Sequence, residues 1–211
     1  MIWWSAAGGL CGELMSDNLN QILVSNTSVF LQIMKEANKN FVKVENQRRA
    51  YEKKRIGKGY DSKLNQFLIE ETKSSFVTIV FAAAYLESFI YDYGSLITSP
   101  EYFDEHLDGL DAVSKWVVIP ELVNGRGIKT DKAAFSCLSE LIKCRNRIIH
   151  SKSRTADRLV GRERKGQGLI ESESKCARTA PQIVKSILKA LLAVESNENM
   201  KEIIAHGVGC L

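Results

Sequence analysis

The sequence predicts an all-α fold, an up-and-down bundle of four to five helices. Only three prolines in 211 residues leave few helix breakers. Apolar residues recur at helical spacing over long stretches, and aromatics at 8% show no regular turn spacing of the kind found in sandwiches or barrels. Hydrophobic residues at 45% and charged residues at 26% are ordinary for a globular domain, which excludes a disordered or fibrous chain.

Two long helices are expected first. Residues 20–55 carry apolar residues at helical spacing, with positive charge increasing toward the end. Residues 63–97 form the second helix, which is apolar on nearly every side between Phe76 and Tyr93. Such a helix either spans a membrane or lies in the centre of a bundle. Because Glu87 and Asp92 interrupt it, we expect a buried central helix and no membrane association.

Shorter elements separated by chain breakers follow the break at Ser99-Pro100. They are a short apolar piece at 114–120 ended by Pro120, a third helix capped by Thr130 or Asp131 that runs to about His150, a fourth helix that opens at Thr179–Pro181, and a short fifth helix at 197–204.

The expected organisation has three parts. Residues 1–20 are an N-terminal extension of unknown role, residues 21–195 form the helical bundle, and residues 196–211 form a short C-terminal helix or tail. Within the bundle, residues 151–177 have almost no large apolar side chains and are dense in Lys, Arg, Ser and Gly. We therefore expect a long basic loop there, and loops of this length are usually functional or disordered.

Positive charge is concentrated in two blocks, although the net charge is only +4. Residues 35–58 hold nine Lys/Arg against three Glu, and residues 152–165 hold six against two acidic residues. Local blocks of this kind predict contact with a polyanion, for which RNA is the expected partner. The alternative is a solvated helix face and a solvated loop.

The cysteines indicate a reducing compartment. There are five of them, an odd number with no CxxC pair, so neither a disulfide framework nor a zinc site is expected. We expect no metal and no other cofactor. The first residues lack the basic stretch of a signal peptide, and the expected location is cytoplasmic.

The residues best suited to chemistry lie at the end of the third expected helix. Asn146 and His150 are one turn apart on the same face, whereas Arg145 lies about 140° from His150 and needs its long side chain to approach it. Histidine can take a proton near neutrality, and arginine can hold a phosphate with two hydrogen bonds. This combination suits RNA cleavage without a metal. Alternatively, Arg and His are there because the helix dipole favours cations at a C-terminus.

Arg145 and His150, separated by four residues and with polar Asn146 directly after the arginine, resemble the motif of the HEPN superfamily. The stretches at 81–90 and 115–120 are similar to its prokaryotic branch. The resemblance implies a helical bundle that dimerises with its motif helices facing each other. Many members are metal-independent endoribonucleases of toxin–antitoxin and anti-phage systems, whereas others bind nucleotides or act as scaffolds. By this resemblance Arg145 and His150 are catalytic and Asn146 is a positioning residue.

Other residues are expected to support the site. A carboxylate in an apolar helix needs a partner if it is buried, so we expect Glu87 to pair with Arg145 or Arg147; alternatively, it reaches the surface. Nothing in the sequence selects among Tyr102, Trp116 and the loop residues as contacts for bases. The residues expected to bind the RNA backbone are Lys152, Arg154, Arg158 and Arg162.

The function hypothesis is a homodimeric, metal-independent endoribonuclease that cuts single-stranded RNA by attack of the 2′-OH. Under this hypothesis the protein is a toxin or an anti-phage component, and an antitoxin or another protein is its partner. The alternative is a non-catalytic helical module that binds a nucleotide or a protein. A membrane protein anchored through residues 76–93 is disfavoured by Glu87 and Asp92.

Overall fold

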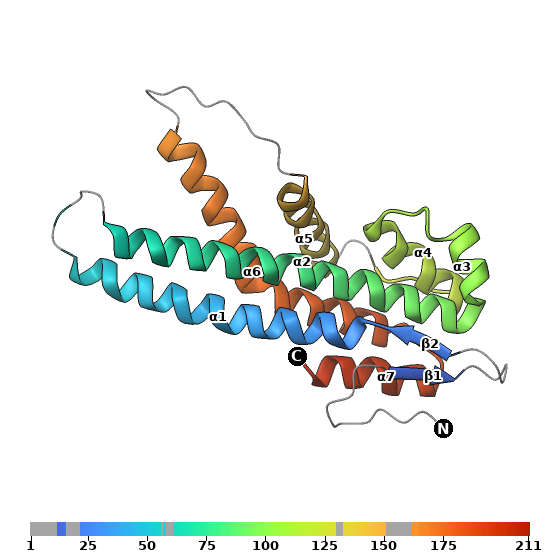
Figure 1. Ribbon diagram of the computed structural model, residues 1–211. Helices are drawn as coiled ribbons and strands as arrows, with labels where there is room; N and C mark the ends of the chain where they lie inside the picture. The colour runs from blue at the N-terminus through green and yellow to red at the C-terminus, as the bar shows by residue number, and fades with distance from the viewer. Residues whose placement is uncertain (1–11, 16–21, 56, 58–60, 130–132, 151–161) are drawn as a thin grey trace.

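The fold is all-α, as predicted (Figure 1). The computed structural model describes residues 12–15, 22–55, 57, 61–129, 133–150 and 162–211, with the backbone only for 12–15, 22–24 and 162–170. Seven helices and one antiparallel hairpin lie within these residues: β1 (Gly12–Met15), β2 (Ile22–Ser25), α1 (Thr27–Lys54), α2 (Ser62–Thr98), α3 (Pro100–His106), α4 (Ala112–Asn124), α5 (Ala133–Ile149), α6 (Arg162–Leu192) and α7 (Glu198–Gly209).

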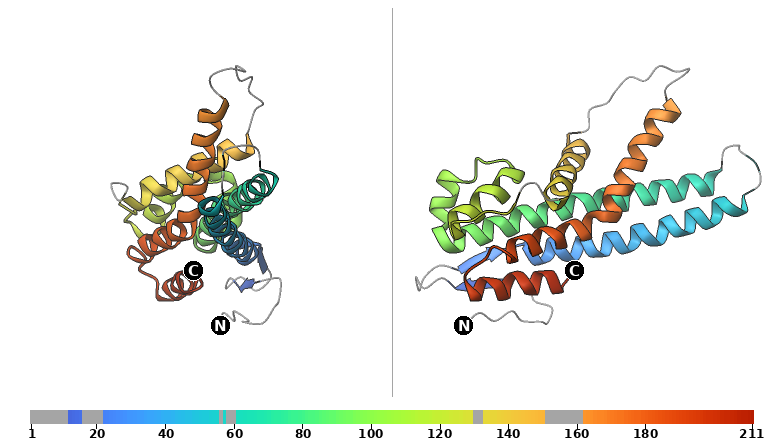
Figure 2. Two further views of the ribbon diagram at one scale, coloured as in Figure 1. Left: turned by 90° about the vertical axis from the view of Figure 1, so that its left-hand side faces the viewer. Right: turned by 180° about the vertical axis from the view of Figure 1, so that it is seen from behind.

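Helix α2 is the centre of the molecule, as expected. It runs antiparallel to α1 as a long hairpin, and it also packs against α3, α4, α5 and α6 (Figures 1 and 2). Its side chains Ile79, Ala82, Leu86 and Ile90 are fully buried in the core. By length and composition α2 is also apolar enough to cross a membrane, and 56% of its most apolar 18-residue window is buried inside the bundle.

The start of α1 differs from the expectation. The helix begins at Thr27 and not at residue 20, because residues 22–25 are extended and pair with residues 12–15. Asp92 of α2 fixes this start: its Oδ2 accepts hydrogen bonds from the hydroxyls of Ser25 (2.5 Å) and Thr27 (2.7 Å). One of the two polar interruptions of α2 therefore anchors the neighbouring helix.

Helices α3 and α4 replace the break and the short apolar piece expected between 99 and 124. Asp111 caps α4 by accepting hydrogen bonds from the backbone of Val113 and Ser114. Pro120 does not end the helix but lies inside it, buried together with Trp116. The apolar area that these side chains bury offsets the cost of a proline within a helix. The helix ends at Gly125, whose φ of +65° is the left-handed conformation that glycine adopts easily.

Helix α6 corrects two expectations. The expected loop at 151–177 is helical from Arg162, and Pro181 lies inside the helix and not at its start. Near 173–177 the buried side of α6 consists of Glu173, Ser174, Cys176 and Ala177, so no large apolar stripe marks it in the sequence. Pro181 has no N–H for the carbonyl of Ala177, and that carbonyl instead accepts a hydrogen bond from Asn38 Nδ2 of α1 at 2.9 Å.

A buried hydrogen-bond network holds the C-terminal end against α2. The hydroxyl of Tyr93 donates to Glu195 Oε2 at 2.5 Å and accepts from Asn124 Nδ2 at 2.8 Å. Glu195 Oε1 accepts from the backbone of Ser196 and Asn197 just before α7. Burial, followed by the bond to Glu195, raises the pKa of Tyr93. The short helix expected at 197–204 is present and continues to Gly209.

Replacing Tyr93 by Phe should lower the free energy of unfolding by about 1–3 kcal/mol, because it leaves the buried Glu195 without its hydroxyl donor. Urea titration followed by circular dichroism measures this. Tyr102→Phe is the matched control, since Tyr102 is exposed and should change stability by less than about 0.5 kcal/mol. Equal stabilities for both variants would contradict the role assigned to the network.

Candidate functional site at the end of α5

The residues singled out from the sequence lie at the C-terminal end of α5, against the middle of α2. Figure 1 looks nearly along the axis of α5, and the left view of Figure 2 shows the helix lengthwise. Arg145 and Asn146 belong to its last turns, and His150 is the first residue after it. The backbone N–H of His150 donates to the carbonyl of Asn146 at 2.9 Å, which holds His150 in helical register.

Glu87 pairs with Arg145, as predicted. Nη2 of Arg145 contacts Oε1 of Glu87, and the two side chains are 21% and 34% exposed, so the ion pair is partly shielded from water. The pair joins α5 to α2 at the one carboxylate in the middle of the apolar helix. Burial lowers the pKa of Arg145, but a guanidinium stays charged at any ordinary pH.

Asn146 and His150 occupy the solvent side of this pair. Nη1 of Arg145 donates a hydrogen bond to Asn146 Oδ1 at 3.0 Å, so the amide helps to orient the guanidinium. His150 is exposed, and its imidazole makes no hydrogen bond or ion pair with the described residues. A fixed cation and an accessible imidazole therefore lie within one and a half helical turns of each other.

Arg147 takes no part in the pair with Glu87. Its Nη2 donates to Cys144 Sγ at 2.9 Å and to Ser172 Oγ at 3.2 Å, and the second contact ties the end of α5 to α6. Of the two arginines that the sequence offered as partners of Glu87, only Arg145 contacts it. Arg147 links α5 to α6.

The remaining expected site residues are only partly described. Lys152, Arg154 and Arg158 lie outside the described residues, and Arg162 begins α6 with its side chain outside them as well. Trp116 is 1% exposed and stacks on Phe89 in the core, so the expectation that it could contact bases is wrong. Tyr102 is exposed on α3, where its ring packs edge-on against His106.

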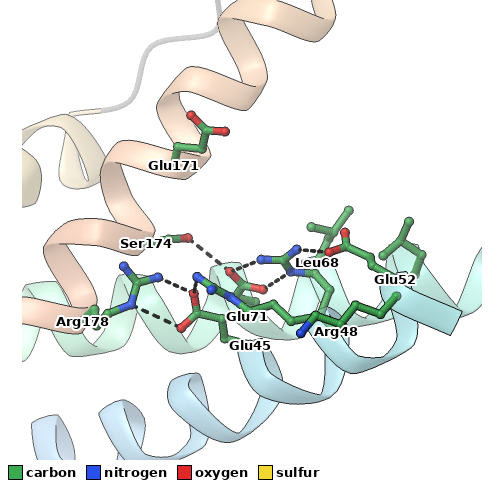
Figure 3. A pocket seen from close by; sticks show the side chains of 11 residues that line it. Glu45, Arg48, Glu52, Leu68, Glu71, Glu171, Ser174 and Arg178 are labelled. Carbon is green, nitrogen blue, oxygen red and sulfur yellow. Dashed lines mark hydrogen bonds and ion pairs between the residues drawn. The ribbon is translucent and has the colours of Figure 1, made fainter. Parts of the chain in front are cut away.

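A second charged cluster, not foreseen from the sequence, lines a cavity of about 990 Å³ between α1, α2 and α6 (Figure 3). Glu71 is buried and accepts hydrogen bonds from Arg48 Nε (2.5 Å) and Ser174 Oγ (3.3 Å). Glu45 is also buried and pairs with Arg178 and Arg49. Each buried carboxylate is thus matched by at least one guanidinium, and the cluster crosslinks three helices.

Burial raises the pKa of the Glu45 carboxyl, but the hydrogen bonds from Arg178 and Arg49 lower it more, so the net pKa lies below its usual value near 4.5. Glu45 and Glu71 are each held by arginine side chains of the protein. The formal charge of the lining is balanced, because Arg48, Arg49, Lys53 and Arg178 accompany Glu45, Glu52, Glu71 and Glu171. The chemistry of this cluster is that of a structural clamp.

Among the described residues, no three His, Cys, Asp or Glu side chains are grouped so as to hold a metal ion. No protein-family model, no curated protein and no solved structure matches this chain. The resemblance to the HEPN superfamily therefore depends on the residues themselves, above all on Arg145 to His150.

The Glu45 cluster should make stability depend on acid. Because the folded pKa of Glu45 is depressed, its contribution is present above about pH 4.5 and is lost as pH falls through the folded pKa. Glu45→Gln should lower the free energy of unfolding by about 2 kcal/mol at pH 7. The difference in this free energy between wild type and the variant should become smaller below pH 4, as measured by urea titrations at a series of pH values.

Glu70→Gln is the control, because Glu70 forms an exposed pair with Lys73 and should change stability little at any pH. If the free energy of unfolding of wild type exceeds that of Glu45→Gln by the same amount at pH 3 as at pH 7, the role assigned to the carboxylate is contradicted.

Proposed function

We propose that the chain is a metal-independent endoribonuclease that cuts single-stranded RNA. The observation that carries the proposal is the arrangement at the end of α5, where Glu87 and Asn146 hold the Arg145 guanidinium and His150 is exposed, with no hydrogen bond from its imidazole to the described residues. Both groups that phosphodiester cleavage needs, a proton acceptor and a fixed cation, are present without a metal.

In this mechanism the imidazole of His150 takes the proton of a ribose 2′-OH. The oxygen attacks the adjacent phosphorus, the bond from phosphorus to the 5′-oxygen of the next nucleotide breaks, and this oxygen takes a proton from water to become a 5′-hydroxyl. A 2′,3′-cyclic phosphate remains, and the imidazolium returns its proton to solvent. Arginine has five N–H groups, of which Arg145 uses two on Glu87 and Asn146. The other three make no hydrogen bond with the described residues, and we propose that they bind the non-bridging oxygens, where negative charge increases in the transition state.

The site is proposed to be completed by a second copy of the chain. Arg145 and His150 lie about 140° apart around α5, so one helix alone aims them in different directions. Apolar surface flanks the Glu87–Arg145 pair: Ile149, one turn beyond Arg145, is 52% exposed. Half-buried Phe76, Val80 and Ala84 share the Glu87 side of α2. A two-fold contact through this surface sets two motif helices opposite each other.

RNA is proposed to be held by two basic segments of the chain. The C-terminal half of α1 is rich in exposed Lys and Arg, and Lys152, Arg154, Arg158 and Arg162 follow directly after His150 in the chain. Such residues bind the phosphate backbone without selecting sequence. We propose that the protein acts in the cytoplasm as a toxin or an anti-phage component. An antitoxin or another protein partner controls its activity.

One observation favours a second candidate, a non-catalytic nucleotide- or protein-binding module. Glu87 already neutralises the charge of Arg145, as in an ion pair whose role is to fix α5 on α2. In that case the cation and His150 stabilise the C-terminal end of the helix. RNA cleavage by purified protein separates the two candidates.

Cleavage of a mixed single-stranded RNA in excess EDTA tests the proposal. Wild type should produce fragments with 2′,3′-cyclic phosphate ends, and Arg145→Ala and His150→Ala should each reduce the rate by about 10²–10⁴-fold. Lys143→Ala is the matched control, since Lys143 is an exposed cation on the same helix paired only with Glu140, and it should retain full activity.

Intact RNA with folded, dimeric wild type would contradict the nuclease and favour the binding module. Equal activity in all four proteins would indicate a contaminating nuclease and would show the site to be wrong.

The proposed dimer is tested by Ile149→Asp. A charge in the apolar contact should weaken self-association at least about tenfold, because it becomes buried without a partner. Sedimentation equilibrium measures the dissociation constant. Leu122→Asp is the control, because Leu122 is comparably exposed (49%) but lies on α4. Unchanged association of Ile149→Asp, or equal weakening by both substitutions, would contradict this interface.

A further inference from the structure

The charges that line the cavity between α1, α2 and α6 are paired unevenly (Figure 3). At one end, Nη2 of Arg49 and Nη2 of Arg178 both contact a single oxygen, Oε1 of Glu45. Burial raises the pKa of Glu45, but the hydrogen bonds from the two arginines lower it more, so the carboxylate stays ionised near neutral pH. Two guanidinium charges therefore meet one carboxylate charge, which leaves this end of the cavity positive.

The opposite pairing is found at the other end of the cavity, where one arginine serves two carboxylates. Arg48 donates to Glu71 through Nε and Nη2, and to Glu52 through Nη1. The lining as a whole is neutral, but its positive charge is concentrated at the Glu45 end. A cleft with such a separation of charge attracts an anionic group to its positive end.

The positive end has hydrogen-bond donors to spare. Of the five N–H groups of an arginine, Arg49 uses one on Glu45 and Arg178 uses two, and the others make no hydrogen bond with the described residues. The two side chains are 58% and 43% exposed, so a ligand reaches them without separation of the helices. Lys53, one turn after Arg49 on α1, also lines the cavity; it is exposed and forms no ion pair with the described residues.

The cavity has room for more than a single ion. Its volume of about 990 Å³ is at the upper end of the range of roughly 300–1,000 Å³ that is common for small-molecule sites. Half-buried Leu64 and Leu68 of α2 add apolar surface to the charged lining. The ligand that fits therefore joins an anionic group to an organic part.

We propose that this cavity binds a phosphate ester, whose phosphoryl oxygens accept hydrogen bonds from Arg49 and Arg178 while Lys53 adds a third positive charge. Arginine matches phosphate oxygens with two parallel hydrogen bonds, and an anion beside two guanidinium groups offsets their mutual repulsion. A small monoester and a phosphodiester of RNA are the two sources of this group. The inference concerns binding and does not rest on the proposed ribonuclease activity.

The test is isothermal titration calorimetry of the full-length protein at constant ionic strength, because added salt screens exposed charges. Ribose 5-phosphate is the monoester, and ribose is its uncharged control. A 2′-O-methyl RNA oligonucleotide without terminal phosphates is the diester, and it cannot be cleaved by attack of a 2′-OH. At least one of the two phosphate ligands should bind and ribose should not, and the ligand that binds identifies the source.

Arg49→Gln should weaken binding of that ligand at least about tenfold, because it removes charge-assisted hydrogen bonds. Arg178 still pairs with Glu45 in this variant, so the cluster keeps a link between α1 and α6. Lys53→Gln leaves no described partner unpaired and should weaken binding about threefold. Lys43→Gln is the matched control: it removes the same charge from an exposed position of α1 outside the cavity and should change the affinity less than about twofold.

Failure of folded wild type to bind either phosphate ligand would overturn the proposal, as would equal affinities of wild type and Arg49→Gln. Equal weakening by Arg49→Gln and Lys43→Gln would show an effect of general surface charge and would overturn it as well. Arg145→Ala, which disables the proposed ribonuclease, should still bind ribose 5-phosphate if wild type does. Loss of this binding in Arg145→Ala but not in Arg49→Gln would place the phosphate at the end of α5 and refute the cavity.

Discussion

The structure depends on burying α2, a 37-residue helix that is apolar on nearly every side between Phe76 and Tyr93. No single partner covers such a surface, so α1, α4, α5 and α6 pack around it. Fully buried side chains such as Ile79, Leu86 and Ile90 supply the hydrophobic free energy, at about 1.5–3 kcal/mol each. The other helices are placed where they bury the apolar sides of α2.

The polar residues of α2 determine where each neighbour is held. Asp92 accepts from the hydroxyls at the start of α1, Tyr93 bonds to Glu195 before α7, and Glu71 pairs with Arg48 and Ser174. Glu87 holds Arg145 of α5. Hydrophobic burial alone is not directional, whereas a buried polar group requires a partner at a defined place. The candidate site at the end of α5 depends on Glu87, because this carboxylate holds Arg145 against α2.

The part of α6 near residues 173–177 shows how a helix packs without a large apolar stripe. Its middle turns bury Glu173, Ser174 and Cys176, and the break in hydrogen bonding at Pro181 is filled by Asn38 from α1. The charged cavity lies along this helix (Figure 3). Small and polar side chains there allow close approach of α5 and α1, which is why Arg147 of α5 reaches Ser172 and Arg178 reaches Glu45 of α1.

The sequence by itself determined the helical class, the extent and central position of α2, and the pairing of Glu87 with an arginine of the third expected helix, since apolar periodicity and an interrupting carboxylate are local signals. The tertiary structure alone decided that Arg145 and not Arg147 makes that pair, that Trp116 belongs to the core, and that α6 begins at Arg162 and continues through Pro181. In each of these cases the outcome depends on a partner distant in the chain. The carbonyl freed by proline meets an amide of α1, and the polar side of α6 is buried where Glu71 of α2 accepts a hydrogen bond from Ser174. No periodicity within a segment reports such a partner.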